Sequence, residues 1–103
     1  MLTTKPLVEV AIAMMSDQDG KYWGYRLMKE TGLRSGVLYP VLDRMLADGW
    51  LSDGWEEQEA ARRKHVRRRY YELTDKGRRE LGAVLARAQT DERFRGLDFG
   101  WAT

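Results

Sequence analysis

The residues of this sequence that are best suited to binding chemistry are basic, and a third of them lie in one short run. Positions 62–69 hold six of the 18 lysines and arginines. Without that run the chain would have 12 basic and 16 acidic residues, a net charge of −4 in place of +2. Positive charge concentrated in this way is typical of a contact with a polyanion. The basic residues of the run are Arg62, Arg63, Lys64, Arg67, Arg68 and Arg69.

The residue types that enzymes and metal sites use are scarce. The sequence has no cysteine and a single histidine, His65, which lies inside the basic run and is interpreted as a solvated side chain. The sequence therefore lacks the cysteines that a cysteine-based zinc site needs, and it offers little for Ser-His or Cys-His catalysis. The carboxylates of Glu56, Glu57 and Glu59 are crowded together, and the sequence offers them no evident buried partner. We expect no enzymatic activity, no metal site and no cofactor.

The segment 35–48 is predicted to be a helix with one apolar face and one outward face. Apolar residues recur at three- and four-residue spacing on one side, at Leu38, Val41, Leu42, Met45 and Leu46. Ser35 has a hydroxyl suited to capping the helix start. The outward face has small and hydrogen-bonding residues, so the helix could lie in the major groove of DNA, which is about 12 Å wide. An ordinary amphipathic core helix is the alternative.

DNA contacts are expected from the start of this helix and from its outward face. Side chains and N–H groups at a helix start can approach phosphate, and an apolar side chain can contact a thymine methyl group. The ring of Tyr39 could instead belong to the core while its hydroxyl reaches the DNA backbone. The candidate contacts are Arg34, Ser35, Gly36, Val37, Tyr39 and Arg44.

Two further helices are predicted before this one. Pro6 suits the first turn of an apolar helix over 7–15, which we expect to be buried on several sides, in part by a partner subunit. Residues 22–31 form the second, with Gly32 as its stop. The short connection to 35–48 makes these two helices a helix-turn-helix candidate.

A β-ribbon and a last helix follow. Residues 50–55 are predicted to form a strand interrupted at Asp53-Gly54, residues 56–68 a loop, and residues 70–73 an antiparallel partner strand. Thr74 is expected to cap a final helix that reaches about residue 89. The fold class is therefore mainly α with a two-stranded antiparallel wing, a winged helix-turn-helix plus a C-terminal helix. We divide it into 1–73 and 74–103, which form one compact unit.

The place of the basic run in this fold favours DNA. A loop between two strands of a winged helix can meet phosphates, and each neutralised phosphate steepens the log–log salt dependence by roughly 0.9. The alternative is a solvated loop, or pairing with Glu56, Glu57 and Glu59. We expect the loop to be poorly ordered without DNA, because nothing in it can pack.

The chain resembles the PadR family of bacterial transcriptional regulators over roughly residues 7–85. Two elements are specific in combination: Leu-Tyr-Pro at 38–40 and Tyr-Tyr-x-Leu-Thr-x-x-Gly at 70–77. The resemblance also covers 23–27, 35–45, 49–51, 55–57 and 69–77. It implies a homodimeric repressor whose third helix enters the major groove while the wing touches the adjacent backbone or minor groove. The chain is similar to the short subfamily, which dimerises through one C-terminal helix.

The apolar seam of the last helix needs a partner, and the resemblance implies dimerisation through the terminal helices. The residues expected in the dimer interface are Leu7, Val8, Ala11, Leu81, Val84, Leu85 and Ala88. Several members of the family respond to small aromatic or cationic compounds near that interface. Trp101 and Phe99 are therefore candidates for an effector pocket, with tail packing or disorder as the alternative.

The composition is that of a single domain with a cytoplasmic location. No apolar run approaches the roughly 20 residues that a membrane span needs, so we expect no membrane partner. Double-stranded DNA and a second copy of the chain are the expected partners. The alternative is a winged helix used for protein interaction, in which the basic run binds an acidic partner.

Overall fold

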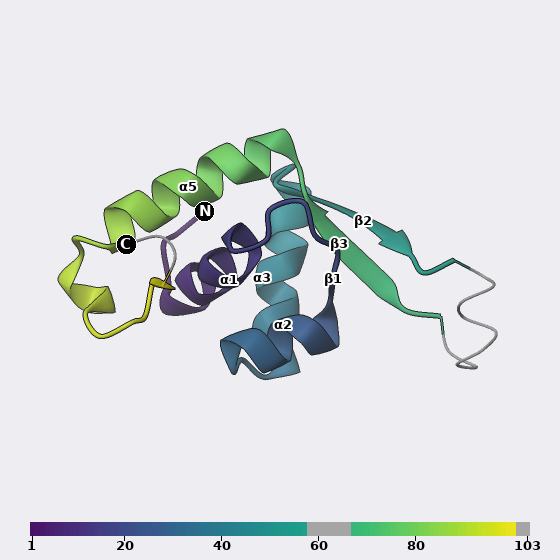
Figure 1. Ribbon diagram of the computed structural model, residues 1–103, viewed down its shortest axis with the longest axis horizontal. Coiled ribbons are helices and arrows are strands. Elements are labelled where there is room, and N and C mark those ends of the chain that lie inside the picture. The colour runs from purple at the N-terminus through teal and green to yellow at the C-terminus, as the bar shows by residue number, and fades with distance from the viewer. Residues whose placement is uncertain (58–66, 101–103) are drawn as a thin grey trace.

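The computed structural model describes residues 1–57 and 67–100. These residues form four α-helices, a three-stranded antiparallel sheet and one 3-10 helix (Figure 1). The mainly helical winged helix-turn-helix is confirmed. In chain order the elements are α1 (Lys5–Met15), β1 (Tyr22–Trp23), α2 (Gly24–Thr31), α3 (Ser35–Ala47), β2 (Leu51–Trp55), β3 (Arg69–Leu73), α5 (Asp75–Ala88) and η1 (Glu92–Phe94).

The sheet has one strand more than the sequence predicted, because β3 lies between β1 and β2 and pairs with both. The predicted helix over 22–31 is wrong at its start, since Tyr22 and Trp23 pair with β3 and α2 begins only at Gly24. The Tyr22 hydroxyl donates a hydrogen bond of 3.0 Å to the carbonyl oxygen of Ala13. Burial raises the pKa of Tyr22, which keeps this donor protonated. Tertiary pairing therefore overrides the local helical pattern.

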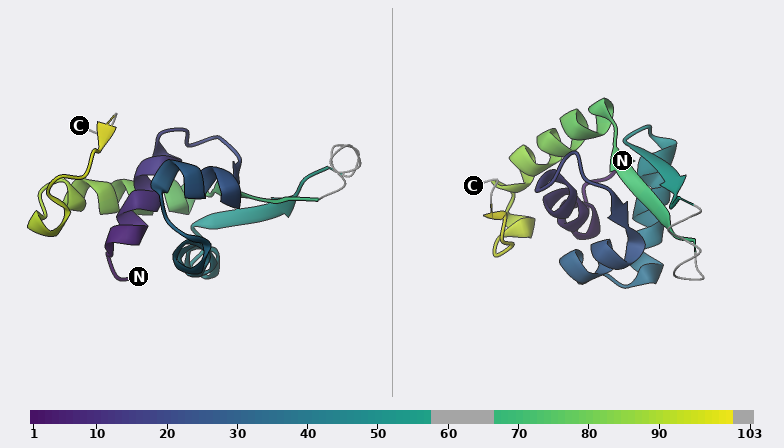
Figure 2. Two further views of the ribbon diagram at one scale, coloured as in Figure 1. Left: turned by 90° about the horizontal axis from the view of Figure 1, so that it is seen from below. Right: turned by 45° about the vertical axis from the view of Figure 1, so that its right-hand side comes forward.

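The two longer strands, β2 and β3, project from the helices as the stem of the wing (Figure 2). Strand β2 runs through Asp53 and Gly54 without the predicted interruption. A Cβ atom at Gly54 would lie 2.5 Å from the hydroxyl oxygen of Tyr70, so the ring of Tyr70 occupies the space of the missing side chain. Asp53 forms an ion pair with Arg69 on β3. Both turn-forming residues thus have a role inside the strand.

The core lies between α1, α5, the inner face of α3 and one face of the sheet. On α3 the predicted stripe is fully buried at Leu38, Leu42 and Met45, whereas Val41 and Leu46 are only partly buried. The prediction that α1 is buried on several sides is confirmed. Its buried residues are Leu7, Val8, Val10, Ala11, Ala13, Met14 and Met15.

The residues expected at the dimer interface lie instead in the core of the single chain. Helix α5 packs along α1 (Figure 1), and this contact covers the apolar seam that the sequence left without a partner. Each of the seven side chains is at most 3% exposed, so none is available to a second copy of the folded chain. The corrected residues are Leu7, Val8, Ala11, Leu81, Val84, Leu85 and Ala88.

Helix α5 is fastened at its first turn to the junction between α3 and β2. Thr74 caps the helix as predicted, since its hydroxyl accepts a 2.9 Å hydrogen bond from the N–H group of Gly77 and donates one of 2.6 Å to the carbonyl oxygen of Gly49. Gly49 adopts a φ of 76°, which ends α3 as the sequence indicated. A Cβ atom at Gly77 would lie 1.9 Å from the carbonyl oxygen of Trp50. The helix therefore approaches the backbone too closely for a side chain.

Two glycines of α5 provide a matched test of this contact. Gly77→Ala should lower the free energy of unfolding by about 1–3 kcal/mol, because the added methyl group meets a backbone atom that cannot move aside alone. Gly82→Ala should leave it unchanged or raise it by up to about 1 kcal/mol, since its nearest neighbour would be the Met15 methyl at 3.8 Å. Urea denaturation measures the free energy of unfolding of each variant and of the unchanged protein. Equal stabilities would contradict the close approach.

Candidate DNA-binding surface

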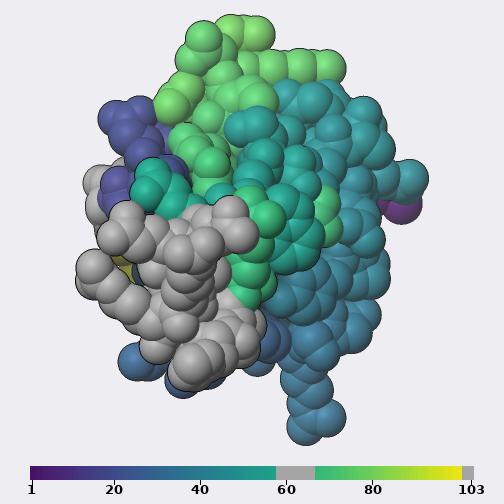
Figure 3. All heavy atoms as spheres, turned by 90° about the vertical axis from the view of Figure 1, so that its right-hand side faces the viewer, coloured from purple at the N-terminus to yellow at the C-terminus, as the bar shows by residue number. Residues whose placement is uncertain are grey.

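The outward face of α3 brings together all the DNA contacts predicted on this helix. Its side chains lie on the side opposite the buried stripe, and all are exposed. Val37 is 44% exposed and Tyr39 is 38% exposed, so their apolar surface is accessible to a base edge. Figure 3 views the end of the molecule from which the wing projects and shows α3 beside the strands. The exposed residues of this face and the helix start are Arg34, Ser35, Gly36, Val37, Tyr39, Pro40, Asp43, Arg44 and Ala47.

The start of α3 is open. The N-cap residue is Arg34, one position before the predicted Ser35, and no side chain caps the helix. The prediction that the Ser35 hydroxyl caps α3 is therefore wrong, because the helix begins at Ser35 itself. Uncapped N–H groups together with the exposed side chain of Arg34 form a surface that suits a phosphate.

Tyr39 connects this face to α2. A Cβ atom at Gly24 would lie 2.0 Å from the Tyr39 hydroxyl oxygen, so the phenol tip rests on the first residue of α2. The alternative placed the ring in the core and the hydroxyl at the DNA backbone, whereas Tyr39 is 38% exposed and its hydroxyl oxygen packs against Gly24. The sequence did signal a close approach at Gly24, since a glycine in a helical pattern is unfavourable without a packing reason. It did not indicate which side chain makes that approach.

The arginines at the base of the wing have partners within the chain. Arg69 bonds to Asp53, which raises the pKa of Arg69, and its guanidinium lies 5.2 Å from the ring centre of Tyr71. The Nε of exposed Arg67 donates a 3.1 Å hydrogen bond to the carbonyl oxygen of Glu56. The acidic partner of Arg69 is therefore Asp53 on β2, and not one of the three glutamates that the sequence suggested for the basic run.

Arg68 is the most constrained of these arginines. Its guanidinium forms a 3.2 Å ion pair with Glu56, whose side chain is only 8% exposed, and lies 4.7 Å from the ring centre of Trp23. Trp23 is the residue that precedes α2. Arg68 thus joins the wing to the helix-turn-helix, a role that the charge pattern alone did not reveal. The remaining predicted contacts of the run, Arg62, Arg63 and Lys64, and its expected order without DNA, lie outside the described residues.

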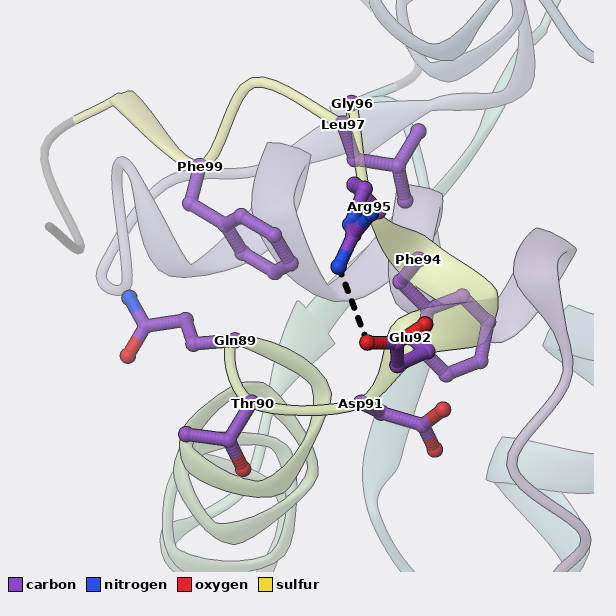
Figure 4. Close-up of a pocket in the computed structure, with 9 residues that line it drawn as sticks. All are labelled: Gln89, Thr90, Asp91, Glu92, Phe94, Arg95, Gly96, Leu97 and Phe99. Carbon is purple, nitrogen blue, oxygen red and sulfur yellow. Dashed lines mark hydrogen bonds and ion pairs between the residues drawn. The ribbon is translucent and has the colours of Figure 1, made fainter.

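The tail after α5 packs on the same chain and forms a small cavity. Phe94 and Phe99 are buried, and with Leu97 they line a cavity of about 320 Å³. Arg95 and Glu92, which also line this cavity, form an ion pair of 2.8 Å, drawn as a dashed line in Figure 4. Phe99, a predicted effector contact, therefore reaches a cavity as well as the core. Trp101 lies outside the described residues.

Other kinds of site find no support in the part of the chain that the structure describes. No group of three or more acidic or histidine side chains there is arranged to hold a metal ion. Within the same residues, no helix has the length and apolar character that crossing a membrane requires.

Together these features define a class of protein. A helix-turn-helix with an exposed second helix, followed by a projecting two-stranded wing, is a DNA-binding winged helix. The model of the transcriptional regulator PadR-like family matches residues 13–83, and the chain belongs to this family. It is therefore a DNA-binding regulator of transcription, and the family is not an enzymatic one. Curated protein sequences give no match.

Solved structures agree with this assignment. A PadR-like transcription factor from Bacteroides fragilis is 30% identical, with a TM-score of 0.59 and a match that covers 82% of each chain. A PadR family transcriptional regulator from Eggerthella lenta is 26% identical over 78% of this chain and 71% of its own, with a TM-score of 0.61. The circadian clock associated protein Pex from Anabaena shares the fold at 15% identity, with a TM-score of 0.63 over 82% of this chain and 76% of its own.

The contacts of Arg68 and Arg44 lead to opposite expectations for their removal. Arg68→Ala should lower the free energy of unfolding by about 1–3 kcal/mol, because it takes the ion-pair partner from a buried carboxylate. Arg44→Ala should have an effect within about 0.5 kcal/mol, since this side chain is exposed on α3. Thermal and urea denaturation compare the two. An equally small effect of both substitutions would show that the Glu56–Arg68 pair does not support the fold.

Proposed function

We propose that the chain is a homodimeric repressor that binds a two-fold-related operator through α3. The observation that carries this proposal is the exposed face of α3, where apolar, hydroxyl and guanidinium groups lie on the side opposite the buried Leu38, Leu42 and Met45. Such a face can read base edges in the major groove. Tyr39 has a second role, since its hydroxyl tip also packs against Gly24 of α2. The protein acts in the cytoplasm, where its DNA is accessible.

Within this surface the side chains have different roles. Val37 contacts a thymine methyl group, and Arg44 contacts phosphate or guanine. Arg34 and the open start of α3 contact phosphate. In the wing, Arg67 is the described arginine most available to DNA because it is exposed and uses only its Nε in a bond to the chain. Arg68 and Arg69 position the wing instead.

The dimer forms through the outward face of α5, since the inward face is already covered by α1. This face has small residues at Ala83 and Ala86, flanked by the exposed Glu80 and Arg87. In a two-fold antiparallel crossing centred between residues 83 and 84, Glu80 of one copy lies opposite Arg87 of the other, and the same pair forms twice. Neither side chain has an ion-pair partner within the described residues. The face is therefore complementary to itself in charge.

Selection from a random pool of DNA duplexes at physiological salt tests the mode of reading. The intact protein should enrich a palindrome whose half-sites lie about 34 Å apart. Val37→Ala should change the base preferred at one position of each half-site. Arg67→Ala should weaken binding to every duplex and reduce the salt slope by roughly 0.9, without a change of motif. Arg95→Ala, which removes a charge from the tail, is the control for charge alone.

Two results would contradict the proposal. If the folded protein enriches no sequence, the alternative is favoured, a winged helix that binds an acidic protein partner.

A reporter gene placed behind the selected operator tests repression separately. Its expression should fall when the regulator is supplied, and a rise in expression would show an activator instead.

The dimer is tested by exchanging its paired charges. Glu80→Arg places like charges opposite each other twice, so the dimer dissociation constant should rise by about tenfold or more. The double variant Glu80→Arg, Arg87→Glu restores both pairs with reversed polarity and should return the constant close to that of the wild type. Sedimentation velocity over a concentration series gives the three values. If all three proteins associate equally, α5 is not the interface.

A further inference from the structure

The exposed face of α3 has one negative charge in the middle of a surface that suits DNA. Asp43 is the only acidic residue between Ser35 and Ala47, and its side chain is exposed. It follows Tyr39 by four residues, so it lies one turn further along the same side of the helix. A carboxylate beside phosphates disfavours binding to any duplex. If α3 enters the groove, this charge needs a compensating contact there.

Asp43 lies on the side of α3 that faces the wing. Helix α3 packs against β2 and lies beside the strands in Figure 3. Burial raises the pKa of Tyr71 on β3, and the charge of Asp43 acts on that hydroxyl in the same direction. The hydrogen bond to Asp53 raises the pKa of Arg69, and Asp43 adds to this effect as well. Val37 projects from α3 about 120° away from Asp43, so the two side chains belong to different edges of the exposed face.

The carboxylate of Asp43 is not neutralised by a bond within the described residues. Arg69, on which its charge acts, is already bonded to Asp53. Among the described residues, the Asp43 side chain has no ion pair and no hydrogen bond. The next residue, Arg44, projects about 100° away around the helix. The oxygens of Asp43 can therefore accept hydrogen bonds from a ligand of α3.

The major groove offers few groups that a carboxylate can bind. Only the amino groups of cytosine and adenine donate hydrogen bonds there, whereas guanine and thymine present acceptor oxygens. In adenine the acceptor N7 lies next to the amino group and repels the second oxygen of a carboxylate. Cytosine has a C5–H group at that place, so it causes no such repulsion. A carboxylate on a reading helix therefore favours cytosine.

We propose that Asp43 is a specificity-determining residue, which accepts a hydrogen bond from the amino group of a cytosine at one position of each half-site. This inference rests on the proposed function, in which α3 enters the major groove. At any other base the carboxylate meets acceptor atoms and phosphates without compensation. Asp43 therefore acts in two ways, because it binds the correct base pair and weakens binding to other sequences. Val37 and Asp43 read different base pairs, since they lie on different edges of the face.

Selection of bound duplexes by the wild-type protein and by Asp43→Asn tests the base preference. The amide has the size of the carboxylate but no charge, and it can both donate to N7 and accept from the amino group of adenine. At one position of each half-site, the preference should therefore change from cytosine to adenine. Affinity for a duplex without the motif should rise roughly two- to fivefold, because a charge that repels phosphate is removed. The control Glu72→Gln removes a carboxylate on the opposite side of β3 from Tyr71 and should change neither result.

A base analogue identifies the hydrogen bond itself. The base 2-pyrimidinone is cytosine without its amino group, and it can replace the selected cytosine opposite the same guanine. The wild-type protein should then lose affinity by roughly tenfold, whereas Asp43→Ala should lose less than about twofold, because no carboxylate is left to lose its donor. Equal losses by the two proteins would overturn the inference.

The selection separates this inference from the proposed function. If the wild-type protein enriches a palindrome and Asp43→Asn enriches the same one, the reading role of Asp43 is wrong and the proposed function stands. If the wild-type protein enriches no sequence, both are wrong.

Discussion

The position of β3 between two antiparallel neighbours is the constraint on which the rest of the fold depends. Strand β1 leads directly into α2, and β2 follows α3 after a short turn. Because one strand forms hydrogen bonds on both edges, it fixes the start of α2 relative to the end of α3. Tyr71, in the middle of β3, is 1% exposed and ties the sheet to the core. The helix-turn-helix thus owes its geometry to a strand that comes later in the sequence.

The same strand decides what its neighbouring arginines can do. Consecutive residues of an extended chain point to opposite sides, so Arg68 and Arg69 meet different partners, a buried carboxylate and Asp53. Breaking the pair between Arg68 and Glu56 would leave a buried carboxylate without a counter-charge. The pair therefore favours one fixed position of the wing. Positive charge on a wing therefore does not translate directly into contacts with phosphate. Part of it is used to hold the wing in place.

Membership of the PadR-like family agrees with these features, and the particular chain adds its own variations. The short α5 is followed by a tail whose aromatic residues return to the core, so the α1–α5 seam is closed within one copy. This leaves the outward, mixed-charge face of α5 exposed. One cavity lies in the tail, and another lies at the base of the wing.

The sequence by itself determined most of the local elements and the division of α3 into a buried and an exposed face. Helical periodicity separated the buried stripe of α3 from its outward face, and Thr74, Gly32 and Gly49 marked helix ends through capping and positive φ, which are properties of single residues. Tertiary structure decided everything that depends on residues far apart in the chain. Tyr22 and Trp23 became a strand because β3 offers hydrogen bonds, and the apolar seam of α5 found α1 rather than a second copy. Periodicity shows that a face must be covered, but only the packed fold decides what covers it.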